Sequence, residues 1–255
     1  MNEKKEGFLF SSFIPSFRER SYELERLDKG DYTPAEYEDC LVELRRVNRL
    51  LGDASALRRS LLKEIEREGL RSFSVLDAGA GSGELLRVAA AWARDTGRRA
   101  FLAGLEFNAR SAQAIREESE GLPEITSVRG DALGLPFADD SFDYAICSLF
   151  THHFKDDQVV VILRELSRVA RRRIFVIDLH RHPLAYYLYT TLGRLLLHNP
   201  LVREDGALSI LRSFRPDELR RLALRAALRD VAVRRRFPFR LVLSGSKNAT
   251  RRDER

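Results

Sequence analysis

The sequence predicts a single α/β domain built on a mostly parallel sheet, and three observations support this prediction. From residue 73 onward, apolar strand-like runs alternate with amphipathic helical patterns, an order typical of parallel sheets. A strand, a glycine-rich turn and a helix follow one another over residues 73–94. The 255 residues are 44% hydrophobic, and no Pro-, Gly- or Ser-rich linker divides them, so one large core is expected.

Helical patterns without strand signals precede the sheet and predict an N-terminal helical extension over residues 1–70. Pro34 follows Thr33 at the start of one helix, whose apolar residues then recur at helical spacing, and Gly69 ends a second helix. We expect the main domain over residues 71–246 and a disordered tail over residues 247–255.

The main domain should contain seven strands with helices between them. The patterns predict strands near residues 73–77, 101–106, 125–129, 142–147, 173–178, 231–236 and 239–244, and helices near residues 84–94, 109–119, 156–169 and 216–228. The last two strands are separated only by Pro238 and should form a hairpin-like ending. Ligands bind at the carboxyl ends of parallel strands. The residues expected at that edge are Asp77, Glu106, Asp131, Cys147 and Asp178.

The glycine-rich turn reads Asp77-Ala78-Gly79-Ala80-Gly81-Ser82-Gly83. Glycines allow the backbone to approach a ligand closely, and the first N–H groups of the following helix have no partner within it. A dinucleotide fingerprint would require glycine at position 84, but Glu84 stands there and would face a pyrophosphate. An acid two residues before the first glycine suits a ligand that carries an ammonium and a sulfonium. The turn therefore favours a cationic cofactor over NAD or FAD.

This turn resembles the first motif of class I S-adenosylmethionine-dependent methyltransferases, and later stretches fall where that family would place its own. Residues 102–106 are similar to the second strand, whose final acid binds the ribose hydroxyls, and residues 130–132 to the loop whose aspartate meets the adenine. Residues 135–148 resemble the approach to the fourth strand. The resemblance spans roughly residues 73–180. It implies a Rossmann-like class I methyltransferase fold, with a mostly parallel seven-stranded sheet, helices on both faces, an N-terminal helical lid and S-adenosylmethionine as cofactor.

The resemblance also implies a set of cofactor-binding residues on the motif turn and at the three strand ends. They are Asp77, Ala78, Gly79, Ala80, Gly81, Gly83, Glu106, Phe107, Asp131, Ala132, Cys147 and Ser148. In the family, N-terminal helices often close over cofactor and substrate. One side chain among Arg45, Arg46, Asn48 and Arg49 is therefore a candidate for the cofactor carboxylate, although all four also fit the surface of a packed helix pair.

His152 and His153 follow the fourth predicted strand and are the candidate catalytic residues. Positioning of donor and acceptor supplies most of the rate acceleration of methyl transfer, about 7–11 kcal/mol, but a phenolic acceptor also needs a base near neutral pH. Histidine can accept that proton. The alternative is that the pair caps or packs the next helix. A metal site formed by His152, His153, Asp178, His180 and His182 is disfavoured by their strand-to-loop spacing, so no metal is predicted.

Two further stretches bear on the acceptor. Residues 180–189 carry three tyrosines and several aliphatic residues, which favours a pocket for an apolar or aromatic guest, although an aromatic stripe also fits a core. The segment Cys147-Ser-Leu-Phe150 differs from the Asn/Asp-Pro-Pro-Tyr/Phe motif of methylases that modify amino groups of nucleic-acid bases. We expect methylation of a small molecule, with O-methylation of an aromatic or lipid-like secondary metabolite or a quinone precursor as the specific reaction.

Charge and cysteine content complete the expectations. The net charge of +6 and the clusters at residues 171–173 and 234–236 raise the question of nucleic acid, but acidic residues are interleaved with the arginines throughout. We expect no nucleic-acid partner. The alternatives are an RNA or protein methyltransferase that uses an arginine-rich face, and a cofactor-binding partner protein without turnover. Two distant cysteines, no convincing signal peptide and no membrane span predict a cytoplasmic protein.

Overall fold

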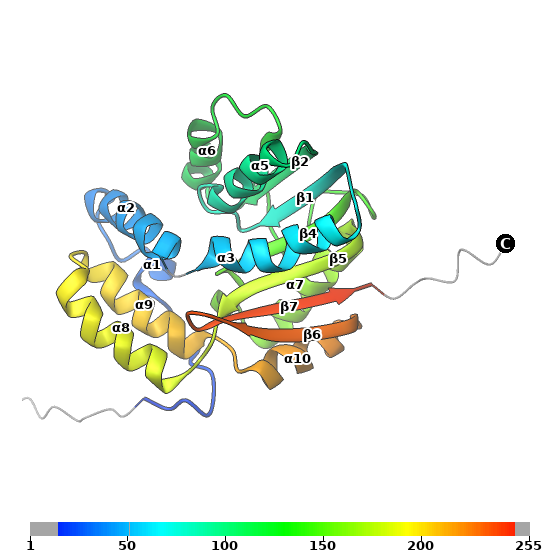
Figure 1. The fold of residues 1–255 in the computed structure, drawn as a ribbon. Coiled ribbons are helices and arrows are strands. Elements are labelled where there is room, and N and C mark those ends of the chain that lie inside the picture. Colours follow the sequence, from blue (N-terminus) through cyan, green and yellow to red (C-terminus); the bar gives the residue numbers. More distant parts are fainter. Residues whose placement is uncertain (1–14, 51, 248–255) are drawn as a thin grey trace, which may run out of the picture.

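The computed structural model describes residues 15–50 and 52–247, and its centre is one seven-stranded sheet (Figure 1). The strand order is β3-β2-β1-β4-β5-β7-β6. The strands are β1 (Ser72–Ala78), β2 (Arg99–Glu106), β3 (Ile125–Arg129), β4 (Phe142–Ser148), β5 (Ala170–Leu179), β6 (Arg229–Arg236) and β7 (Arg240–Ser246). Strands β1 to β5 pair in parallel, whereas β7 runs antiparallel to both β5 and β6. The predicted mostly parallel sheet with a hairpin ending is confirmed.

Helices cover both faces of the sheet. One face packs against α5 (Glu84–Asp95) and against a continuous helical segment formed by α3 (Asp53–Leu57), the π-helical turn η1 (Arg58–Leu62) and α4 (Lys63–Arg67). Helix α6 (Ala109–Glu118) lies beside β2 and β3. The other face packs against α7 (Asp156–Val169) and α10 (Pro216–Arg225). Since both faces are covered, the central strands are apolar on both sides, as expected for a parallel sheet.

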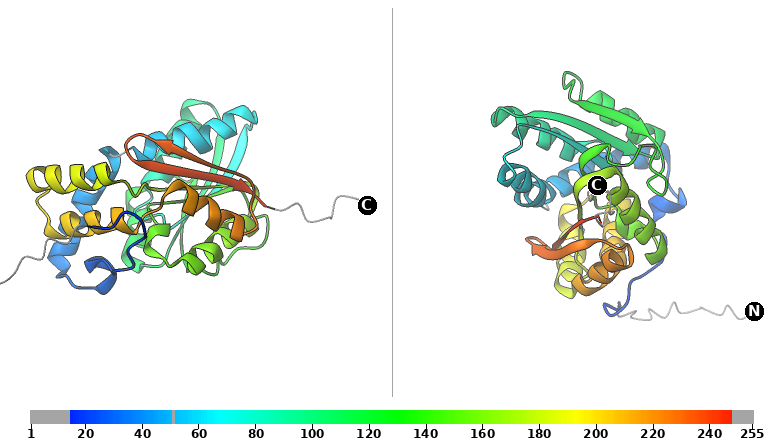
Figure 2. Two further views of the ribbon diagram at one scale, coloured as in Figure 1. Left: turned by 90° about the horizontal axis from the view of Figure 1, so that it is seen from below. Right: turned by 90° about the vertical axis from the view of Figure 1, so that its right-hand side faces the viewer.

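Four further helices gather where the parallel strands end (Figures 1 and 2). They are α1 (Arg26–Lys29), α2 (Pro34–Leu50), α8 (Pro183–Leu196) and α9 (Pro200–Arg212). The sequence analysis assigned no helix to residues 183–212. The local signals were present, because His182 and Asn199 cap these two helices with their side chains and a proline occupies the first turn of each. No helix in the described ranges is long and apolar enough to cross a membrane.

The tyrosines of α8 make packing contacts, whereas residues 180–183 of the predicted acceptor stretch line a cleft. The Tyr189 hydroxyl donates a hydrogen bond to the Val202 carbonyl and so joins α8 to α9. Gly206 makes this packing possible, because a Cβ at that position would collide with the Tyr189 hydroxyl. The side chains of Tyr186 and Tyr187 pack near the Phe17 ring, with ring centroids 5.6 and 6.1 Å from it. The aromatic residues of this segment therefore mainly hold helices together.

Two predicted elements have different boundaries in the structure, and some predicted residues lie outside the part of the chain that the structure describes. The predicted strand at 173–178 extends from Ala170 to Leu179, because α7 passes into β5 without an intervening turn. The predicted last helix ends at Arg225, before a left-handed residue at Ala227. The side chains of Arg45, Arg46, Asn48 and Arg49, and the predicted tail apart from Lys247, lie outside the described residues.

A buried ion pair attaches the helical extension to the sheet. The Arg240 guanidinium at the start of β7 donates hydrogen bonds to the Asp53 carboxylate at the start of α3, and both side chains are buried. Burial raises the pKa of Asp53, although the charge of Arg240 opposes this change. Removal of either partner would leave the other charge buried without compensation.

We predict that Asp53→Ala lowers the free energy of unfolding by about 3–5 kcal/mol, because the Arg240 guanidinium is then left unpaired. Urea unfolding followed by circular dichroism measures this change. Asp157→Ala removes the exposed partner of Arg225 and serves as the control, with an expected change below about 1 kcal/mol. Equal losses in the two variants would contradict the role assigned to the buried pair.

Candidate functional site

The glycine turn between β1 and α5 leaves an open surface at the carboxyl edge of the sheet. Gly79 and Gly81 adopt positive φ values of 72° and 57°, which only glycine takes up readily. A Cβ at Gly79 would collide with the Phe150 ring, so the ring packs directly on the backbone there. A Cβ at Gly81 would meet no described atom within 4 Å. The backbone at Gly81 is therefore accessible to a ligand.

Two carboxyl groups flank this turn. Asp77, at the end of β1, is buried, and its Oδ1 has no hydrogen-bond partner among the described residues. Glu106, at the end of β2, accepts a hydrogen bond from the Gly81 N–H with its Oε1 at 2.6 Å. Burial raises the pKa of Asp77 well above its ordinary value, and the charge of Glu106 raises it further. Two carboxyl groups at this part of the site suit a cationic ligand.

The pKa of Glu106 is also raised by burial, although three backbone N–H groups oppose that change. They belong to Gly81, Phe107 and Asn108. Only one of the two carboxylate oxygens is engaged by Gly81. The Glu106 side chain is therefore held beside the turn and can still accept hydrogen bonds from a ligand.

A cavity of about 250 Å³ adjoins the turn. It is lined by Gly79, Leu105, Phe107, Gly130, Asp131, Ala132, Leu133, Phe150 and Phe154. The Phe150 and Phe154 rings meet edge to face with centroids 4.8 Å apart. Asp131 fixes the loop by accepting the Leu133 N–H at 2.9 Å. Mostly apolar walls with a single carboxylate suit a flat aromatic ring that carries a hydrogen-bond donor.

The other predicted cofactor residues lie partly in the turn and partly in the core. Ala80 and Gly83 complete the turn, and the Ala78 side chain is buried in the core. The Cys147 side chain is also buried in the core, where burial raises the pKa of its thiol well above the ordinary value. Ser148 is partly exposed at the end of β4. Cys147 therefore offers no reactive thiol, although it stands at the strand end next to the site.

His152 is held by the buried carboxylate of Asp178. Its Nδ1 lies 2.7 Å from Asp178 Oδ1, and its backbone N–H donates to Asp178 Oδ2. The Thr151 hydroxyl donates to the same Oδ2 at 2.6 Å. Burial alone would raise the pKa of Asp178, but the charge of His152 and these hydrogen bonds outweigh it and lower the pKa to about 2. The imidazole is thus fixed in orientation, with Nε2 on the side away from Asp178.

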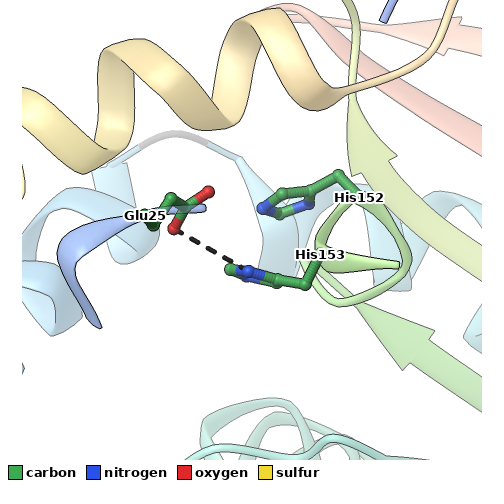
Figure 3. A group of neighbouring side chains, drawn as sticks. All are labelled: Glu25, His152 and His153. Carbon is green, nitrogen blue, oxygen red and sulfur yellow. Dashed lines mark ion pairs between the residues drawn. The ribbon is translucent and has the colours of Figure 1, made fainter. Parts of the chain in front are cut away.

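Two acids from the N-terminal segment, which were not predicted from the sequence, lie beside the histidine pair. Glu25 is buried directly before α1 and faces both rings (Figure 3). The His153 Nδ1 lies 3.8 Å from Glu25 Oε2 and 3.3 Å from Asp28 Oδ1. The His152 and His153 rings are 4.2 Å apart. Burial raises the pKa of Glu25, whereas the charge of His153 and a hydrogen bond from Ser209 oppose the change.

Buried arginines fasten this segment over the histidines. Arg20 donates to the Arg212 carbonyl at 2.7 Å and to the Phe154 carbonyl at 3.1 Å. Arg212 donates to the His153 carbonyl at 2.6 Å and to Asp28 Oδ2 at 2.7 Å. No local pattern in the sequence indicates these contacts, because each of them joins segments that lie far apart in the chain.

The residues considered for a metal site separate into two groups. His180 and His182 have ring centroids 5.3 Å apart and line another cleft. Within the described chain, Glu25, His152 and His153 have potential ligand atoms within 4.8 Å of one another. The Arg212 guanidinium lies 3.9 Å from Glu25 and 2.7 Å from Asp28, so a protein cation already contacts both carboxylates.

Part of this chain is similar to known methyltransferases. Residues 75–173 match a family model described as a methyltransferase domain. A demethylmenaquinone methyltransferase of Roseiflexus sp. (strain RS-1) is 39% identical over 118 residues, which cover 43% of this chain and 44% of that protein. The chain spans less than half the length of the curated relatives that it matches.

Two solved structures show the same fold at low sequence identity. Human N-acetylserotonin methyltransferase in complex with SAM has a TM-score of 0.60 at 17% identity, over 90% of this chain and 63% of that chain. A SAM-dependent methyltransferase from Aquifex aeolicus has a TM-score of 0.59 at 17% identity, over 84% and 98% of the two chains. The predicted Rossmann-like class I methyltransferase fold is confirmed.

We predict that Asp178 makes the protein sensitive to acid. Its pKa of about 2 in the folded state lies below the ordinary 3.8, so the unfolded chain takes up the proton first as the pH falls. The stability difference between the parent and Asp178→Asn should therefore shrink by about 2 kcal/mol from about pH 5 to about pH 2. Urea unfolding at each pH measures it. Asp95→Asn, at an exposed site, is the control, and a difference that stays constant with pH would contradict the assignment.

Proposed function

We propose that this chain, which has the class I methyltransferase fold, is an enzyme that transfers a methyl group from S-adenosylmethionine to a small molecule. The observation that carries the proposal is the pair of carboxyl groups, Asp77 and Glu106, on either side of the open backbone at Gly81. We propose oxygen of an aromatic or quinone-type acceptor as the site of methylation. The similarity to a demethylmenaquinone methyltransferase supports a quinone-type acceptor.

The residues of the turn fit the proposed cofactor. The unpartnered Asp77 oxygen suits an ammonium group, and the available oxygen of Glu106 suits ribose hydroxyls. The cavity beside Phe107, Asp131 and Ala132 suits an adenine ring. When bound, S-adenosylmethionine supplies a methyl group activated by its sulfonium. Because Asp77 and Glu106 flank the turn, it should bind this cation better than it binds a pyrophosphate.

His152 is the proposed general base. An acceptor phenol, with a pKa near ~10, is mostly protonated at neutral pH, so removal of its proton assists the transfer. The Asp178 carboxylate fixes the ring through Nδ1 and would stabilise the imidazolium after proton uptake. His153 is the second candidate, because its side chain is 30% exposed whereas that of His152 is 3% exposed.

We also propose that the N-terminal extension, residues 1–70, contains a lid over the domain formed by residues 71–246, and that the described segment before α3 forms this lid. Glu25 and Asp28 lie beside the histidine pair, and Arg20 fastens the segment to the carbonyl groups around it. An acceptor that reaches His152 must displace or pass this cover. Opening of the segment would therefore admit the acceptor, and closing would exclude water from the reacting atoms.

We predict that Glu106→Gln weakens S-adenosylmethionine binding about 10- to 100-fold, because hydrogen bonds to a charged acceptor contribute about 1.5–3 kcal/mol. The amide oxygen can still accept the Gly81 N–H, so the turn should keep its shape. Isothermal titration calorimetry measures the affinity, and Glu120→Gln, at an exposed position, is the matched control. Unchanged affinity in Glu106→Gln would remove the turn as the cofactor site.

We predict that His152→Gln lowers turnover about 100-fold or more while cofactor affinity stays unchanged, because only proton removal is lost. Transfer of labelled methyl groups to a panel of phenols and reduced naphthoquinones measures turnover, and melting curves report folding. His153→Gln is tested in parallel. A loss confined to His153→Gln would move the base to that residue, and full turnover per folded molecule in both variants would show that positioning alone suffices.

A further inference from the structure

A second and larger cleft, of about 830 Å³, lies beyond the ends of β5 and β6. Its walls come from His180 and His182 after β5, from the first residues of α8 and α10, and from the connection between β6 and β7. Phe17 and Arg18 of the N-terminal segment close one side. The residues that line this cleft are not among those that line the cavity beside the glycine turn.

The cleft carries an excess of positive charge. Five arginines line it, against one acid, Asp217. Arg181 is neutralised by Glu218, whose Oε1 lies 2.5 Å from its guanidinium. The other four form no ion pair with a described carboxylate: Arg18, Arg215, Arg235 and Arg236. The Nε of Arg236 is buried and has no acceptor among the described residues. Such groups gain most from an anionic partner that accepts their hydrogen bonds.

The pKa of His180 reflects its burial and the positive charge of arginines in the cleft. Burial lowers the pKa of His180 to about 4, and the charges of His182, Arg235, Arg215 and Arg181 lower it further. The imidazole is therefore neutral near pH 7 and adds no charge of its own. An anion placed among the arginines would oppose their effect and raise the pKa of His180.

Aromatic rings complete the cleft. Phe17, Phe237 and Phe239 line it together with the arginines. The Phe237 side chain, between β6 and β7, is 88% exposed, although exposure of so large an apolar ring is unfavourable in water. Phe239 packs near the His182 ring, with centroids 5.5 Å apart. Rings next to unpaired guanidinium groups suit a ligand that has both an apolar body and an anionic group.

We propose that this cleft binds an organic anion, with the four unpaired arginines contacting its phosphate or carboxylate group and the phenylalanine rings contacting its apolar body. The proposal does not depend on methyl transfer, since it concerns residues outside the glycine turn and the histidine pair. The cleft nevertheless begins at His180, two residues after the Asp178 that holds His152. His152 and His153 themselves do not line this cleft.

Calorimetry with the full chain and phenyl phosphate, benzoate and phenol tests the proposal without cofactor. We expect saturable binding of at least one anion and much weaker binding of uncharged phenol. Arg235→Gln should weaken anion binding about tenfold or more. Arg234→Gln is the matched control, because Arg234 is exposed on the same strand but does not line the cleft. Tighter binding of phenyl phosphate than of benzoate would identify phosphate as the preferred group.

Nuclear magnetic resonance titration of His180 gives a second measurement. Bound anion should move the titration midpoint of this ring upward, and the shift should be lost in Arg235→Gln but kept in Arg234→Gln. Equal loss of affinity in both variants would indicate general surface electrostatics, as expected for an RNA-binding face, and would overturn the proposal. Absence of saturable binding with Kd below about 10 mM for either anion would overturn it as well.

Discussion

The Asp178 carboxylate is the contact on which the rest of the candidate site depends. It is completely buried at the end of β5. It accepts hydrogen bonds from the Thr151 hydroxyl, from the backbone N–H and the ring Nδ1–H of His152, and from the Leu179 N–H. These bonds join β5 to the short helical turn η2 (Thr151–His153) after β4. A buried carboxylate is tolerated only when its oxygens are satisfied in this way. The same bonds that stabilise the fold therefore also orient the proposed base.

Charge pairing also explains why the N-terminal segment lies where it does. Asp205 in α9 accepts the backbone N–H groups of Arg26 and Leu27 at 2.8 and 3.0 Å, and so caps the first turn of α1. Arg212 of the same helix contacts Asp28. Helix α9 thus holds α1 and the residues before it in place beside the histidines. A displacement of α9 would move Glu25 and Asp28 away from His153.

The sequence predicted those parts of the molecule that depend on local pattern. Alternating strands and helices gave the sheet, and the glycine spacing after Asp77 gave the turn and, through the parallel order, the position of Glu106. Glu25 and Asp28 were not predictable in the same way. Their partners lie more than 100 residues away, at His153 and Arg212, and nothing in the spacing of charged residues near position 25 indicates such contacts. Long-range pairing of this kind is fixed only by the packed tertiary structure.

The carboxyl edge of the sheet therefore carries opposite charge at its two ends. Acids flank the turn at β1 and β2, whereas unpaired arginines line the cleft beyond β5 and β6. Neighbouring strands are about 4.8 Å apart, so three spacings separate β2 from β5 in the order β2-β1-β4-β5. The two groups of charged side chains therefore belong to different strands of the same edge. The proposed cationic cofactor and the proposed anionic ligand would then occupy separate parts of this edge, with His152 after β4 between them.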